Sequence, residues 1–434
     1  MRTGTNRPWG RPLTCRAALV GLLLVVSGCS TPAGTGPAVT YDDVDIDTVT
    51  APAADADGAR DFLGSGTGPA QGDPLLIGWI NEDQGWDVSF RAAAEMLNRE
   101  LDGISGRPIE IVACGDDEDT ATCSDRIGSA EPLLVIIGDT RTPHTRIREG
   151  IAGIPALGVE PDDPGSWTDE LTRYFTLGVP GTLRAAATWA APRGYTGVLV
   201  LVTNEESLTG TLSDFDEAAI PTSTLVLTDE SARDAENRIA EQLDRIADGA
   251  PDQRLLVVNT LDGDGCVSLA RAVDVRVANP SWGQVDVVTT GNCASKTVHK
   301  ALGDWPPGWY HVGAGPDLEL YAIDPQVRVY RDRITRYGGE DADWSGANTL
   351  PFTTLVNAAR MLAPLLEDGR SPAPYDVVTT LGTYTGPGFM GMPAHECGAD
   401  PKRPSLCTHQ ARVFVYNGKR GWANIVGDPF DILR

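Results

Sequence analysis

The sequence predicts an α/β protein with two doubly wound, Rossmann-like lobes, each with a parallel central sheet. Short apolar runs alternate with amphipathic segments from Pro74 onward. The apolar runs are continuous, which is typical of parallel strands that are buried on both faces. This alternation occurs in two successive series, and alternating strands and helices fold as a parallel sheet with covering helices. Residues 74–434 are numerous enough to bury two cores.

The first series begins with the run Leu75–Ile80, which predicts a buried strand. A helix is expected next, because Val88, Ala92, Leu97 and Leu101 lie on one side of a helical period. The remaining segments continue the alternation: strands are expected at 106–114, 132–138, 154–159 and 173–179, and helices at 86–101, 117–130 and 142–152.

The second series has its clearest period at 231–249, where Ala235, Ile239, Leu243 and Ile246 share one helix face. We expect further helices at 180–194 and 208–218, and strands at 196–204, 222–228, 253–260 and 283–292, with 266–275 continuing the alternation. Beyond Pro316 the pattern predicts helical segments at 316–339 and 349–369, a glycine-broken stretch of alternating polarity at 375–394, and a hairpin over 410–426 that turns at Asn417–Gly418.

The N-terminus has the features of an export signal. Four arginines precede an apolar run at 17–26, which is too short to span a bilayer permanently. Val26-Ser27-Gly28-Cys29 resembles the bacterial lipobox, so 1–28 is predicted to be a lipoprotein signal peptide and Cys29 to be acylated, with palmitate for example. An ordinary secretory signal and a poor membrane anchor are the alternatives. The expected location is the extracytoplasmic face of the cell membrane.

Residues 29–73 are predicted to form a disordered tether. They are rich in Thr, Pro, Ala, Gly, Ser and Asp, and such a composition buries too little apolar surface to offset the entropy of ordering. The folded body is expected to start near Leu75.

The charge and the motifs exclude several function classes. The formal net charge is -25, from 60 Asp+Glu and 35 Lys+Arg, and such a surface repels nucleic acid. The same acidity also serves solubility. Signatures of serine hydrolases, zinc proteases and P-loop enzymes are missing, and "LDGDGCVSL" lacks the spacing of a calcium loop. We therefore expect no enzyme, no cofactor and no metal.

Six cysteines remain in the exported body: Cys114, Cys123, Cys266, Cys293, Cys397 and Cys407. An even number in an oxidising compartment favours disulfides, and the layout favours pairs of neighbours among the 15 possible pairings. An alternative at 395–409 is a zinc site made of His395, Cys397, Cys407 and His409, although the oxidising compartment favours the disulfide.

The order of these segments resembles the type I periplasmic binding proteins, in the branch of leucine/isoleucine/valine-type solute receptors of ABC transporters. The resemblance rests on "LLIGWINEDQGWDVSFRAAAEMLNREL" with its following strand, on "LLVIIGDTRT", on "YFTLGVPGTLRAAATWAAPRGYTGVLVLVTN", and on the closing "YTGPGFMGMPA" and "ARVFVYNGKR". It implies one lobe at 74–178 plus 311–370 and a second at 179–310 plus 371–434. It also implies a small polar solute, such as an amino acid or a related amide or amine, in a cleft that closes by a hinge movement, with permease subunits as partners.

The resemblance assigns ligand binding to the loops at the carboxyl ends of the strands. The candidates are Gln84, Trp86, Thr140, Arg141, Thr142, Glu160, Asn204, Asp262 and Asn292. The acid that binds an ammonium group in the family falls at Asn292, and an aromatic of the family falls at Leu208 or Leu261. An extracellular sensor or scaffold lipoprotein with the same two-lobe fold is therefore the alternative function.

Overall fold

The computed structural model describes residues 56–115, 118–161, 164–203, 205, 208, 212–228, 231–247, 253–277, 283–304, 306, 308–316, 318, 324–367, 369, 371–416, 422–424 and 427–433. The predicted signal peptide, the lipidation site Cys29, the ligand candidate Asn204 and the turn at Asn417–Gly418 lie outside the described residues. Among the helices that are described, none has the length and apolar character needed to cross a membrane.

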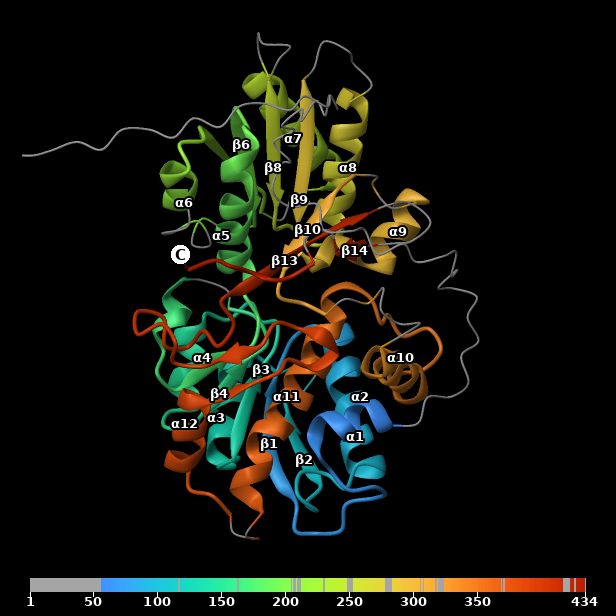
Figure 1. Ribbon diagram of the computed structural model, residues 1–434, viewed down its shortest axis with the longest axis vertical. Helices are drawn as coiled ribbons and strands as arrows, with labels where there is room; N and C mark the ends of the chain where they lie inside the picture. The colour runs from blue at the N-terminus through green and yellow to red at the C-terminus, as the bar shows by residue number, and fades with distance from the viewer. Residues whose placement is uncertain are drawn as a thin grey trace, which may run out of the picture. The chain divides into compact units, whose positions relative to one another are not determined.

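The first sheet is entirely parallel, with strand order β2-β1-β3-β4-β5 (Figure 1). Its strands are β1 (Leu75–Ile80), β2 (Ile109–Ala113), β3 (Leu134–Ile137), β4 (Ala156–Gly158) and β5 (Thr172–Tyr174). Helices α3 (Thr120–Ser129) and α4 (His144–Gly150) cover one face, where Ile127 and Ile147 pack on Ile80 and Val135. Helix α2 (Gln84–Glu100) covers the other face and stacks Phe90 on Trp79, with ring centroids 4.1 Å apart.

The second sheet has the order β14-β13-β10-β9-β8-β6-β7, and its strands from β10 to β7 run parallel. They are β6 (Gly197–Val202), β7 (Thr222–Val226), β8 (Arg254–Asn259), β9 (Gln284–Thr289), β10 (Tyr310–Gly313), β13 (Gln410–Tyr416) and β14 (Trp422–Asn424). β13 runs antiparallel to β10 and β14, and β15 (Phe430–Asp431) pairs with β13. The prediction of two doubly wound lobes is confirmed.

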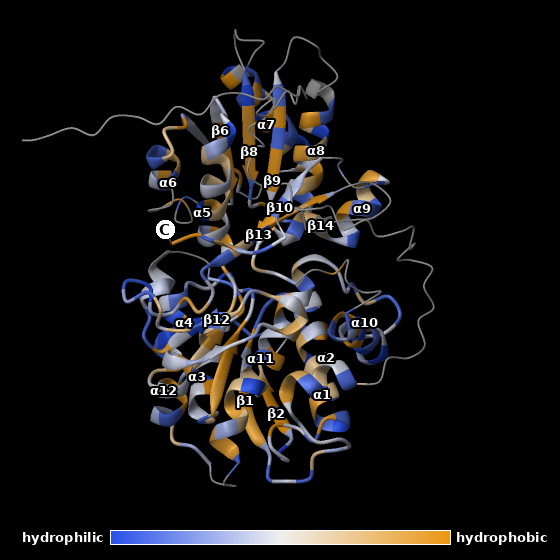
Figure 2. Cartoon of the chain, in the orientation of Figure 1, coloured by the Kyte–Doolittle hydropathy of each residue, from blue (hydrophilic) through white to orange (hydrophobic). Residues whose placement is uncertain are grey.

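Helices lie on both faces of the second sheet as well. α5 (Gly178–Ala190) and α6 (Leu212–Glu217) contribute to one core, whereas α7 (Ala232–Ala247), α8 (Gly263–Val277) and α9 (Lys296–Leu302) contribute to the other. The helix face that the sequence predicted for α7 is buried, since Ile239 and Leu243 are at most 1% exposed. Figure 2 shows the strands of both sheets as mostly hydrophobic.

The chain passes between the first-lobe core and the second-lobe core in three regions: between Phe175 and Leu177, between Ala314 and Val327, and at 397–411, where Leu406 already packs in the second-lobe core and Cys407 still packs in the first. Two of the expected boundaries therefore differ from the structure. The first is residue 311, because β10 pairs with β9 and β13 in the second sheet rather than starting the return to lobe one.

The second differing boundary is residue 371. Helix α12 (Pro374–Thr383) and the turn η7 (Phe389–Gly391) pack into the first core through Val377, Leu381 and Phe389, so this stretch does not belong to lobe two. The alternating polarity at 375–394 was misleading, because Val377 and Leu381 are also four residues apart and line one face of a helix. A two-strand ladder, β11 (Thr385–Gly386) with β12 (His395–Glu396), follows α12.

The prediction of a disordered tether up to residue 73 is wrong for its last part. Helix α1 (Asp57–Leu63) packs against α10 (Pro325–Gly338) and α11 (Thr349–Leu366). Phe62 is 6% exposed and meets the ring of Phe389 edge-on at 5.1 Å. Gly58 lies so close to Pro325 that an added Cβ would be 2.6 Å from its carbonyl carbon. A single buried aromatic ring thus orders a segment whose composition is otherwise that of a linker.

The return of the chain to the first lobe is held by a buried ion pair. Arg333 on α10 is 2% exposed, and its Nε and Nη2 donate to the Glu100 carboxylate of α2 at 2.9 and 2.6 Å. Tyr337 donates to the same carboxylate at 2.7 Å. Partial desolvation raises the pKa of Glu100, but Arg333 and Tyr337 outweigh it, so this pKa lies below its ordinary value.

All three neighbouring cysteine pairs form disulfides: Cys114–Cys123, Cys266–Cys293 and Cys397–Cys407. The alternative of a zinc site at 395–409 is therefore wrong, because both of its sulfur ligands are used in one disulfide. His395 is fully buried, its Nδ1 lies 2.8 Å from the Thr408 hydroxyl, and burial lowers its pKa to about 3.

The substitution Phe62→Ala tests whether α1 is part of the fold. Removing this ring should lower the free energy of unfolding by about 3 kcal/mol, as for other buried Phe→Ala changes. Urea unfolding monitored by circular dichroism measures the effect. Asp61→Ala, at a side chain that is 80% exposed, is the control and should leave the midpoint unchanged. An equally unchanged midpoint for Phe62→Ala would show that the segment is a tether.

The substitution Glu100→Gln tests the buried ion pair. It leaves the Arg333 charge buried without its carboxylate, which should cost about 3 kcal/mol at pH 7. A carboxyl with a depressed folded-state pKa stabilises above its unfolded pKa of about 4.3 and loses that contribution as the pH falls through the folded value. The difference between wild type and variant should therefore shrink below about pH 4. Glu95→Gln, on the same helix with an exposed pair to Arg99, should cost about 1 kcal/mol or less at any pH.

Candidate functional site

Polar residues lie at the carboxyl ends of β1 and β3, which are neighbours in the first sheet. Two hydrogen bonds join the two loops: Glu82 N donates to the Asp139 carbonyl at 2.8 Å, and Asp139 N donates to the side-chain Oδ1 of Asn81 at 3.1 Å. Crevices outside the carboxyl ends of parallel strands are the usual ligand sites of doubly wound sheets. Two of the loops predicted from the sequence to bind ligand, those after β1 and β3, thus form one connected edge.

Arg141 is paired within this edge. Its Nε lies 2.8 Å from Glu82 Oε2, while the side chain as a whole is 94% exposed. Thr120 donates its hydroxyl to the other oxygen of Glu82. Partial desolvation raises the pKa of Glu82, but the bonds from Thr120 and Arg141 outweigh it, so this pKa lies below its ordinary value. Glu82 is therefore a fixed carboxylate at neutral pH.

The edge carries more negative than positive charge. The Asp139 carboxyl interacts electrostatically with Glu82, Asp83 and Arg141. Desolvation raises the pKa of this carboxyl, and repulsion from Asp83 and Glu82 raises it further. Three carboxyl groups and one guanidinium make this edge more favourable for a positively charged group than for an anion.

The candidate Trp86 and the neighbouring Asp83 have structural roles at the start of α2. Trp86 is 8% exposed and belongs to the first core, so its ring packs inside the lobe instead of covering the loop. Asp83 caps the helix, since its Oδ1 accepts the Trp86 N–H at 2.7 Å. The neighbouring Gln84 side chain is exposed, as the first residue of the helix.

The remaining first-lobe candidates lie on the loops after β3 and β4. Thr140 Oγ1 donates to the Thr142 carbonyl at 3.1 Å, which tightens the loop that carries Arg141. Thr142 and Glu160 are half-buried. The structure thus brings Thr140 and Arg141 to the same edge as Glu82, with Thr142 in the same loop.

The second-lobe candidates lie at the ends of β8 and β9. Asp262 is exposed and its Oδ1 accepts the Gly265 N–H at 2.9 Å at the start of α8. Asn292 belongs to the short helix η4 (Gly291–Ala294), and its N–H donates to Thr290 Oγ1 at 3.3 Å. The Cys266–Cys293 disulfide joins η4 to α8 and therefore holds these two loops together.

The edges of the two lobes meet at the short helix η6 (Gly346–Asn348), which precedes α11. On the first-lobe side, Ser89 of α2 donates its hydroxyl to the Asn348 carbonyl. On the second-lobe side, Lys296 N donates to Ser345 Oγ at 2.8 Å. An added Cβ on Gly346 would lie 2.7 Å from the Gly291 carbonyl oxygen. The loop after β9 and the start of α2 are thus joined through one helix.

His311 is a residue of this region that sequence reasoning did not select. It lies on β10 beside Thr289, and its ring stacks on Phe414 with centroids 5.3 Å apart. Enclosure by the protein lowers its pKa to about 4, so the imidazole is neutral at pH 7. A Cβ on Gly291 would be 3.7 Å from its Nε2. If the sequence analysis had assigned β10 to the second sheet, it would have placed His311 at this edge.

The arrangement suits binding of a small polar molecule. The two edges carry main-chain loops, hydroxyls, amides, carboxylates and one guanidinium, which are the groups that orient polar ligands. In the described part of the chain no cluster of three or more His, Cys, Asp or Glu side chains is placed to hold a metal ion.

Neither a protein-family model nor a curated protein matches this sequence. Solved structures do match its fold. A solute-binding protein of an ABC transporter from Rhodopseudomonas palustris, in complex with p-hydroxybenzoic acid, superposes with a TM-score of 0.61 at 12% identity, over 83% of this chain and 98% of that chain.

Two further structures agree. A leucine-binding protein from Thermotoga maritima gives a TM-score of 0.58 at 11% identity, over 83% of this chain and 99% of that chain. A periplasmic substrate-binding protein from Ralstonia solanacearum gives 0.60 at 18% identity, over 81% and 100%. The chain therefore has the type I periplasmic binding protein fold, as the sequence resemblance implied.

The substitution Gly346→Ala tests the contact between the edges. Gly346 has φ +59°, so alanine should cost about 1–2 kcal/mol from backbone strain alone. Gly303→Ala is the matched control, because Gly303 has φ +78° and no atom within 4 Å of an added Cβ. Gly346→Ala should cost more and should speed hydrogen exchange at residues 291–294. Equal effects of the two variants would contradict the contact.

Proposed function

We propose that this protein is an extracytoplasmic solute-binding lipoprotein that captures a small polar solute between its two lobes and delivers it to an ABC transporter. One observation carries the proposal: two α/β lobes are joined by three chain crossings, and their strand-end loops meet at η6. No catalytic role is proposed, since the structural neighbours are binding proteins.

Closure by a hinge supports capture. The lobes have separate hydrophobic cores; in the described part of the chain the crossing segments, the contacts at η6 and a bond from Arg412 Nη1 of β13 to the Gly391 carbonyl of η7 link them. Separate rigid cores on a few connecting segments are the usual basis of hinge closure, in which a ligand stabilises the closed form by its greater affinity for it. A permease that distinguishes the closed form would receive only loaded protein.

The charge of the first edge favours a solute with an amino group. Glu82 is ionised and Asp83 and Asp139 lie close by, whereas Arg141 already pairs with Glu82. A ligand ammonium or amide N–H would replace part of this pairing, with the hydroxyl of Thr140 and the main-chain N–H groups as further contacts. This is compatible with an amino acid or a related amine or amide.

The anchor is part of the same proposal. Cys29 at the end of the signal peptide would carry the lipid and hold the protein at the extracytoplasmic face of the membrane, next to the permease subunits. Mass spectrometry of the membrane fraction tests this point: acylated Cys29 is expected as the N-terminal residue, and an unmodified mature N-terminus elsewhere would contradict it.

A thermal-shift panel tests solute binding. Amino acids, short amides, urea-like compounds and polyamines are added to the purified protein, and at least one class should raise Tm by selective binding to the folded state. Glu82→Gln should weaken that solute at least about tenfold, or about 1.4 kcal/mol. Glu110→Gln, at an exposed position on β2, should leave binding unchanged.

The second candidate is a sensor or scaffold that kept the fold without transport. It is favoured by one observation: Arg141 is paired with Glu82 and Asp262 accepts the Gly265 N–H, so two of the expected ligand contacts are satisfied within the protein. If no compound in the panel raises the Tm of the wild type or of Glu82→Gln, this role is favoured over solute capture.

A further inference from the structure

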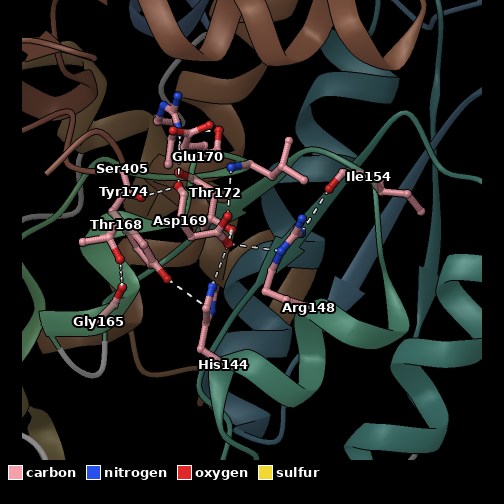
Figure 3. A network of polar contacts seen from close by, with 12 residues as sticks. His144, Arg148, Ile154, Gly165, Thr168, Asp169, Glu170, Thr172, Tyr174 and Ser405 are labelled. Atoms are coloured by element: carbon pink, nitrogen blue, oxygen red, sulfur yellow. Dashed lines mark hydrogen bonds and ion pairs between the residues drawn. The ribbon is translucent and has the colours of Figure 1, made fainter. Parts of the chain in front are cut away.

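The two lobes are joined at the crossings and at η6, and these two regions differ in kind. Figure 3 shows Tyr174 and Ser405 next to each other at the crossings, where the Tyr174 N–H donates to the Ser405 carbonyl at 2.8 Å. At η6, the first-lobe segment 343–348 meets η4 and the start of α9 in the second lobe. The crossings are continuous chain and stay together when the lobes move, whereas the contact at η6 can open.

Ser345 links the lobes through its hydroxyl group. Ser345 Oγ accepts the Lys296 N–H at 2.8 Å and donates to Asp343 Oδ1, which also accepts the Ser345 N–H at 2.9 Å. Lys296 is the first residue of α9, so its N–H has no acceptor within the helix. Ser345 is 5% exposed. A buried first-lobe side chain, oriented by Asp343, therefore satisfies the start of a second-lobe helix.

Trp344 lies beside this bond and carries two cations over its ring. Arg331 Cζ of α10 is 3.8 Å from the ring centroid, and Lys296 Nζ of α9 is 4.5 Å from it. Trp344 packs on the first core, and its carbonyl accepts the Tyr330 hydroxyl at 2.7 Å. The Arg331 contact therefore lies within one lobe, whereas the Lys296 contact forms only when the lobes are together. Trp is the aromatic side chain that attracts a cation most strongly.

The main chains of the two lobes also come close at this point. A Cβ added to Gly346 would lie 2.7 Å from the Gly291 carbonyl oxygen, and one added to Gly291 would lie 3.5 Å from the Ala347 nitrogen. Glycine on both sides thus lets the two backbones touch. Every group in these contacts belongs to the protein, so the contact between the lobes can form without a solute.

We propose that Asp343, Trp344 and Ser345 form a latch that binds the start of α9 and holds the strand-end edges of the two lobes together without a solute. The joined arrangement is then populated before a solute binds. The apparent affinity for a solute that binds this arrangement is the intrinsic affinity multiplied by the joined fraction. The latch residues are therefore positioning residues, which raise the affinity for every solute by the same factor.

Hydrogen exchange in the full chain without added solute tests the latch, because the Lys296 N–H is one of its bonds. Lys296→Met removes the charge from the ring but keeps this N–H, and it retains the fold because the side chain is exposed. Exchange at residue 296 should be about two- to fivefold faster than in the wild type, as for loss of an exposed cation–π contact. Lys300→Met, at an exposed position on the same helix, is the matched control and should leave the rate unchanged.

The double variant Trp344→Ala/Ser345→Ala removes both side-chain contacts and tests whether the lobes separate. Small-angle X-ray scattering without added solute should give a larger radius of gyration than for the wild type. Slow hydrogen exchange in β1 and β8 would show that both lobes remain folded. An unchanged radius of gyration with both lobes folded would overturn the latch, and so would an unchanged exchange rate at residue 296 in Lys296→Met.

The effect on affinity rests on the proposed function. Among the compounds that raise Tm in the thermal-shift panel, Lys296→Met should weaken all by one factor, whereas Glu82→Gln should weaken those with an amino group. Unequal weakening by Lys296→Met would mean that Lys296 contacts the solute, and would overturn its positioning role. If no compound binds, the proposed function fails, while the exchange and scattering measurements still decide whether the latch exists.

Discussion

The contact on which the two-lobe arrangement depends most is the ion pair between Glu100 on α2 and Arg333 on α10. The chain leaves the first lobe after β5, builds most of the second sheet, and then has to return. α10 is the first helix of that return, and Arg333, at 2% exposed, fastens it to α2 through a bidentate bond. Any other placement of α10 would leave the buried Arg333 charge without its carboxylate, which is costly. The pair therefore fixes how α10, and with it α1 and α11, packs against α2.

Rigid lobes give the strand-end loops their geometry. The β1 and β3 loops are tied by a main-chain bond from Glu82 to Asp139 and by a bond from Asp139 N to the Asn81 side chain, and the β9 loop is tied to α8 by the Cys266–Cys293 disulfide. Because each edge is held by bonds within its own lobe, a ligand that contacts both edges loses little binding free energy to ordering their loops. Two of the crossings are bonded to each other, since Tyr174 N donates to the Ser405 carbonyl and Cys407 N donates to the Tyr174 carbonyl.

Much of the fold could be predicted from the sequence, because buried parallel strands such as Leu75–Ile80 and Gly197–Val202 leave continuous apolar runs, and the α7 face leaves a clear helical period. The predictions were wrong where packing between segments far apart in the sequence determines the structure. Phe62 orders α1 only because Phe389 and Pro325 are there to receive it, and β10 joins the second sheet only because β9 and β13 lie beside it. At the site, the loop positions followed from strand ends, but the roles did not: Trp86 is in the core, Arg141 pairs with Glu82, and His311 was not selected.

Hydrogen exchange measured by mass spectrometry, with and without the solute that stabilises the protein, tests the central claim most directly. The account predicts that the solute slows exchange in both lobes at once, in the loop at 81–86, in η4 at 291–294 and in η6 at 346–348, with little change in α3 and α7. Protection confined to one lobe, or none at these loops, would contradict capture between the lobes.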